Sequence, residues 1–147
     1  MERCKAFSVV IQRNSYITTR VARKKFDLKI ACWYVRTLLQ KGKLENVKHE
    51  IARLGIIVLG ISETRWPGED DCKSDGFRII HSGGEESQQG VAIILDKRTA
   101  NCVEKVRCEG DRLLMVKLKG KPVDVCIIQV CQQRNIVRKK LKTCMRR

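Results

Sequence analysis

Apolar residues in the first part of the chain recur at two spacings, and each spacing predicts a type of element. A short run at 28–33 indicates a strand, and 56–61 is apolar without alternation, as in a strand covered on both faces. Between them, Gly55 stands where a helix is expected to end. The residues before it fall at helical spacing: Leu44, Val47, Ile51 and Leu54. Strand, helix and buried strand are the opening of an α/β fold.

Further strands are predicted by four apolar runs in the second part of the chain. They lie at 77–80, 91–95, 113–118 and 123–130. Their close spacing favours hairpins, and residues 125–128 are apolar on both sides, which predicts a strand covered on both faces. A polar stretch with Pro67, Gly68 and four acids is expected to be a loop, in which the Asp70 and Asp71 carboxylates are solvated.

The predicted elements leave the sheet incompletely covered. At least two strands are expected to be buried on both faces, but the pattern supplies one amphipathic helix. A second layer is therefore expected to be missing, and the tail at 134–147 cannot supply it because half of its residues are basic. Either another chain completes the core, or the exposed sheet face leads to self-association.

Charge divides the 147 residues into three parts. The net charge of +15 comes mostly from residues 1–26, with seven Lys or Arg and one acid, and 134–147, with seven and none. Residues 27–133 are nearly neutral, and their length suits one domain. We expect a disordered basic extension, a domain and a basic tail. Solvated tails and salt-sensitive attraction to DNA both remain open for the flanks. No apolar run approaches a membrane-spanning length, so a membrane role is not expected.

Eight cysteines would suit a secreted disulfide framework, but no apolar signal sequence opens the chain. No Cys-x-x-Cys pair occurs, and His49 and His81 are far from any paired cysteines, so a structural zinc site has no support. Reduced intracellular thiols are the expectation. The composition of residues 1–26 also fits a mitochondrial transit peptide, although no helical period runs through them.

Six segments in order resemble the endonuclease/exonuclease/phosphatase family, specifically the endonuclease domain of RTE-like non-LTR retrotransposons and the craniofacial development protein 2-like sequences. The resemblance covers about residues 28–131. The matching segments are Trp33-Tyr34-Val35-Arg36-Thr37-Leu38, Leu59-Gly60-Ile61-Ser62-Glu63-Thr64-Arg65-Trp66, Ser74-Asp75-Gly76-Phe77, Gly90-Val91-Ala92-Ile93-Ile94-Leu95, Asp111-Arg112 and Ile127-Ile128-Gln129-Val130.

The resemblance implies a four-layer α/β sandwich of the deoxyribonuclease I-like type and Mg²⁺-dependent hydrolysis of a phosphodiester bond. The fold expected here is an incomplete version, mostly one mixed sheet with one main helix. Glu63 matches the metal-binding glutamate of the family, and it follows a buried strand at the end where α/β proteins bind ligands. The alternative for Glu63 is a surface ion pair with Arg65.

Three departures from the family pattern fall on the chemistry. Tyr34 stands where the family has Asn, and Cys131 begins Cys-Gln-Gln where the family has Tyr-Ala-Pro. The later Asp-x-Asn segment and the terminal Asp-His pair have no counterpart, and no histidine follows His81. We therefore expect no intact catalytic set and poor Mg²⁺ binding by Glu63 alone.

Three hypotheses follow from these departures. The first is a truncated, inactive remnant of a retrotransposon endonuclease. The second is an active endonuclease that another chain completes, and the third is a nucleic-acid-binding module that uses the basic flanks.

Overall fold

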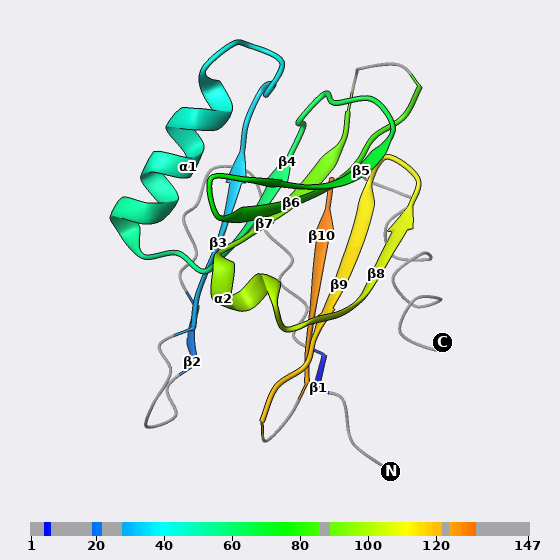
Figure 1. Cartoon of the computed structure of the whole chain (residues 1–147). Coiled ribbons are helices and arrows are strands. Elements are labelled where there is room, and N and C mark those ends of the chain that lie inside the picture. The colour runs from blue at the N-terminus through cyan, green and yellow to red at the C-terminus, as the bar shows by residue number, and fades with distance from the viewer. Residues whose placement is uncertain (1–4, 7–18, 22–27, 86–88, 122–123, 132–147) are drawn as a thin grey trace.

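Two facing β-sheets with one long helix on the outside make up the described part of the chain (Figure 1). The computed structural model describes residues 5–6, 19–21, 28–85, 89–121 and 124–131. The α/β fold class expected from the sequence is confirmed.

The larger sheet is mixed and has six strands in the order β2-β3-β4-β7-β6-β5. Strands β3 and β4 are parallel, and the other neighbours are antiparallel. The bounds of the strands are β2 Thr19–Val21, β3 Leu28–Tyr34, β4 Val58–Ser62, β5 Glu69–Ser74, β6 Phe77–Ser82 and β7 Val91–Leu95.

Helix α1 (Lys43–Leu54) connects the parallel strands β3 and β4 and covers one face of this sheet. It ends at Gly55 in the left-handed conformation (φ 64°), as the sequence predicts. Val47 and Ile51 are buried against Leu59 and Ile61 of β4 in one apolar cluster. The expected helix and the expected fully buried strand are both confirmed.

The smaller sheet has the order β1-β10-β9-β8 and packs on the opposite face of the larger one. Its strands are β1 Lys5–Ala6, β8 Val103–Glu109, β9 Leu113–Leu118 and β10 Val125–Val130. Val58, Ile93 and Leu95 share one buried cluster with Leu114 and Val116 of this sheet. The expectation of a missing second layer is therefore wrong for β4, whose second face the smaller sheet covers, because the sequence reasoning counted only helices as cover. The larger sheet covers only the inner face of β10, and no helix among the described residues packs on the outer face of the smaller sheet, in keeping with the expected incomplete sandwich.

The predicted loop around Asp70 and Asp71 is also wrong, because these residues belong to β5. The strand lies at the edge of the larger sheet and is almost fully exposed, which explains its polar sequence. It joins β6 through Asp75 and Gly76, which both have positive φ (50° and 83°), as a tight hairpin turn requires. The Asp71 carboxylate accepts from Arg78 at 2.7 Å, so it pairs with a cation.

Several sequence predictions fall partly or wholly outside the described residues. Two short strands, β1 and β2, lie within the expected disordered extension, and the rest of 1–26 is not described. Residues 123 and 134–147 are also outside the description.

A short helix, α2 (Lys97–Ala100), is capped by the Asp96 carboxylate, which accepts from the Thr99 N–H at 2.8 Å. No helix in the described part is long and apolar enough to span a membrane.

Candidate functional site

The candidate site lies where β3 and β4 end side by side. Because the two strands are parallel and Tyr34 is paired with Ser62, the residue after β4, Glu63, comes close to Tyr34. The Tyr34 hydroxyl donates a hydrogen bond to Oε2 of the Glu63 carboxylate at 2.6 Å. A charged acceptor makes this bond stronger than a neutral one. Tyr34 is 48% exposed, so the pair stands at the surface.

Strand β10 brings the third sequence-predicted position, Cys131, to the same place. Gln129 Nε2 donates to Ser62 Oγ at 2.8 Å, which connects β10 to the end of β4. Burial raises the pKa of the Cys131 thiol, and the negative charge of Glu63 raises it further. The structure therefore gathers Tyr34, Glu63 and Cys131, which lie far apart in the sequence.

The backbone around Glu63 is strained. Glu63 and Arg65 both have φ 59°, in the left-handed region that side chains other than glycine rarely adopt. Between them Thr64 is fully buried, and its carbonyl accepts from the Leu38 N–H at 2.9 Å. Arg65 N–H donates to Gln89 O at 2.8 Å. Such over-determined strain is typical of functional segments.

Sequence reasoning gave no role to Asp111 and Arg112, although this pair is one of the matching segments. The Cys131 N–H donates to the Arg112 carbonyl at 2.8 Å. Burial and Glu63 have the largest effects on the pKa of the Cys131 thiol. Among the smaller effects, the charge of Arg112 lowers this pKa and the charge of Asp111 raises it. The two side chains also pair with each other at 3.6 Å. Membership of Asp111 and Arg112 in a matching segment could have indicated that they lie near the site. Their distance along the sequence from Glu63 and Cys131 could not.

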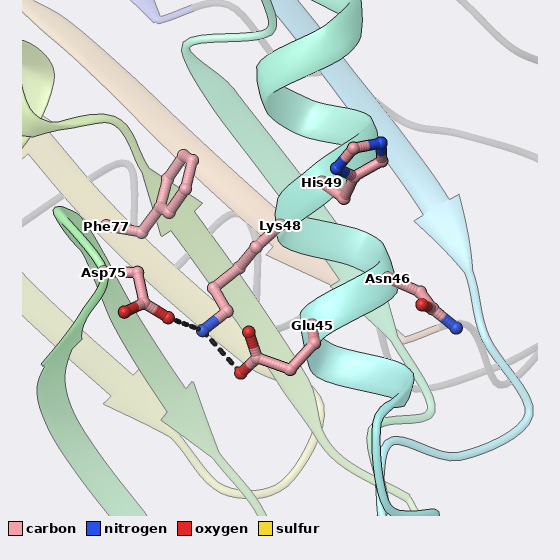
Figure 2. Close-up of a pocket in the computed structure, with 6 residues that line it drawn as sticks. All are labelled: Glu45, Asn46, Lys48, His49, Asp75 and Phe77. Atoms are coloured by element: carbon pink, nitrogen blue, oxygen red, sulfur yellow. Dashed lines mark hydrogen bonds and ion pairs between the residues drawn. The ribbon is translucent and has the colours of Figure 1, made fainter.

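The two histidines lie in different environments. His81 of β6 stacks edge-on with Trp66, with ring centroids 5.1 Å apart, and burial lowers its pKa. Its buried Nδ1 has no partner among the described residues. His49 lies instead in a shallow hollow beside α1, where Lys48 pairs with Glu45 and Asp75 (Figure 2).

Glu63 is the position that the family resemblance assigns to a metal ion. No group of three or more His, Cys, Asp or Glu side chains in the described ranges is placed to hold a metal ion. Magnesium prefers near-octahedral oxygen coordination that includes carboxylates, and here one carboxylate oxygen already accepts from a phenol. Between the described residues no ion pair joins Glu63 to Arg65 either, so the alternative expected for Glu63 is not formed.

Comparison with known proteins gives two curated relatives and six solved chains, among them one retrotransposon endonuclease domain. The chain is 38% identical to craniofacial development protein 2 of Bos taurus and 37% identical to that of Tragulus javanicus, in each case over 107 residues and 72% of this chain. The match spans 18% of the length of either relative. No family model matches the chain.

The solved structure is the endonuclease domain of TRAS1, a telomere-specific non-LTR retrotransposon. The TM-score is 0.54 at 12% identity, and the match covers 80% of this chain and 50% of that one. The predicted resemblance is confirmed: the chain is craniofacial development protein 2-like and has an endonuclease-type fold.

Proposed function

We propose that this chain is a catalytically inactive remnant of a retrotransposon endonuclease domain. The observation that carries the proposal is the hydrogen bond from Tyr34 to the Glu63 carboxylate, together with the lack, among the described residues, of any group of three or more His, Cys, Asp or Glu side chains that could hold a metal ion. The ancestral chemistry that the family resemblance implies is metal-dependent hydrolysis of phosphodiester bonds. Truncation of the chain remains a prediction from the sequence.

The chemistry of the three gathered side chains supports this proposal. Hydrolysis of a phosphodiester at neutral pH needs an ion that neutralises the developing charge and a base that activates water. Glu63 supplies one carboxylate, and the Tyr34 hydroxyl donates a hydrogen bond to it rather than adding a charged ligand oxygen. Burial and Glu63 both hold the Cys131 thiol in its neutral form by raising its pKa, so it does not serve as a base.

The test is nicking of supercoiled plasmid by the purified full chain with Mg²⁺, compared with its Glu63→Gln variant. We expect the two proteins to give the same background rate, with and without EDTA. Glu63→Gln preserves the shape of the side chain and its ability to accept from Tyr34, so a difference between the two reports the charge rather than the fold.

Mg²⁺-dependent nicking by the full chain that disappears in Glu63→Gln would overturn the proposal. Nicking that persists equally in both proteins indicates a contaminating nuclease, which a second purification step and a heat-treated sample identify. A metal-dependent commercial nuclease in the same buffer controls for the quality of the substrate.

A further inference from the structure

The edges of the two sheets are protected in different ways. On one side of the sandwich the edge strands are β5 and β8. Four of the six residues of β5 are charged, and β8 has four charged residues among seven and an irregularity between Val103 and Lys105. Charges and bulges are the features by which natural edge strands avoid pairing with another chain.

The strands at the other side lack this protection in their own sequences. Strand β10 contains no charged residue, and β3 contains only Lys29. Each would be an edge strand without a two- or three-residue neighbour from the N-terminal segment (Figure 1). Strand β1 pairs with β10 at Val125 and Cys126, and β2 pairs with β3 from Leu28 to Ile30.

The backbone of β3 faces β2 with its even-numbered residues. The Lys29 carbonyl accepts from Ile57 N–H at 3.0 Å, so Lys29 bonds toward the β4 side. Backbone groups alternate direction along a strand, and Leu28 and Ile30 therefore point to β2. Their register partners are Val21 and Thr19, whereas Arg20 faces Lys29 and directs its own N–H away from β3.

The backbone of β10 follows the same rule. Because the Cys131 N–H donates to Arg112 O, the odd-numbered residues of β10 bond toward β9. Even-numbered residues such as Ile128 direct their N–H and C=O to the β1 side. Each of the two strands therefore presents a row of backbone donors and acceptors with which a further strand could pair.

We propose that β1 and β2, which both lie within residues 1–26, are intramolecular edge caps: they occupy the otherwise open edges of β10 and β3 and keep the chain from pairing with a second copy. Both caps are too short to template further pairing, and each carries a basic residue, Lys5 or Arg20. The whole segment has seven Lys or Arg and one acid, so two capped chains repel each other. The basic extension thus acts in folding and assembly, independently of whether the domain cleaves DNA.

Two deletions of nearly equal charge test the proposal. Removing 1–26 takes away both caps, whereas removing 134–147 takes away seven basic residues and no described strand. Light scattering after size-exclusion chromatography should show monomers for the full chain and for the 134–147 deletion, and dimers or larger species for the 1–26 deletion. Added peptide 1–26 should restore the monomer. A monomeric 1–26 deletion, or equal association of both deletions, would overturn the proposal.

A pair of proline variants in the full chain keeps the test decisive if the 1–26 deletion does not fold. Val21→Pro removes an N–H that faces Leu28, whereas Arg20→Pro removes one that points away from β3. We expect deuterium exchange of residues 28–34 to become on the order of tenfold faster in Val21→Pro and to stay unchanged in Arg20→Pro. Equal exchange in the two variants and the full chain would show that β2 does not cap β3.

Discussion

Gly60 in the centre of β4 leaves room for a side chain that connects the two sheets. A Cβ atom added at this position would stand 1.9 Å from Gln129 Oε1 and 2.8 Å from its Cδ. Gln129 is only 6% exposed, and its amide accepts from Cys32 Sγ at 3.4 Å and donates to Ser62 Oγ at 2.8 Å. The Gly60→Ala variant therefore cannot keep the Gln129 side chain in its present place.

The cost of Gly60→Ala has two parts. Adding a methyl group to a packed interior typically costs about 1 to 3 kcal/mol. Moving the Gln129 amide also breaks its bond to Ser62 and its weak contact with Cys32, and each lost hydrogen bond in a buried place costs about 1 kcal/mol. We expect the free energy of unfolding to fall by about 2 to 4 kcal/mol, a large share of the stability of a small domain.

Urea denaturation followed by the fluorescence of Trp33 and Trp66 measures this change. The matched control is Gly84→Ala, whose added Cβ would lie 3.4 Å from the Asp111 carboxylate, an ordinary contact. The control should leave stability unchanged or raise it by up to about 1 kcal/mol. In the double variant Gly60→Ala/Gln129→Ala the clash is absent, so the two effects should be less than additive. A Gly60→Ala protein within about 0.5 kcal/mol of the original would refute the reasoning, as would strict additivity.

Two further predictions concern buried charges. Lys48, only 4% exposed, pairs with Glu45 at 2.6 Å and with Asp75, so Lys48→Met should lower the free energy of unfolding by about 1 kcal/mol in urea denaturation. Arg53→Met, in the exposed pair with Glu50 on the same helix, should lower it less, and equal losses in the two variants would contradict this. Burial lowers the pKa of folded His81 below that of the unfolded chain, so the unfolded state binds more protons and stability should fall as the pH drops below about 6.5. Melting temperatures measured between about pH 8 and about pH 5 should depend less on pH in His81→Gln than in the original chain, and an unchanged pH dependence would exclude His81 as the cause.

The elements that could be predicted from the sequence are those whose buried residues follow a local pattern along the chain. Helix α1 shows its apolar face at helical spacing, and β4 is buried from Val58 to Ile61 because α1 and the smaller sheet cover its two faces. Strands β5 and β8 were missed because edge strands carry polar residues that also occur in loops. The smaller sheet was missed because local spacing does not reveal which strands pack across the core.

The candidate site was predicted in part, through the family resemblance. That resemblance assigned Glu63 to the metal and identified Tyr34 and Cys131 as departures, and the structure brings the three together. The hydrogen bond between Tyr34 and Glu63 needs the parallel register of β3 and β4, which no single segment encodes. Asp111 and Arg112 reach the same place through the pairing of β9 with β10, again a long-range contact.

The departures at Tyr34 and Cys131 are compatible with a retained fold, and this follows from where the two residues lie. Tyr34 is half-exposed, and substitutions at exposed positions usually change stability by no more than about 0.5 kcal/mol. Cys131 is buried in the apolar cluster between the sheets, where a neutral thiol behaves as a small hydrophobic side chain. By contrast, truncating Leu59 or Ile61, which are fully buried, would cost about 2 to 5 kcal/mol and threaten folding itself. A loss of catalysis through changes at Tyr34 and Cys131 would therefore not require a loss of structure.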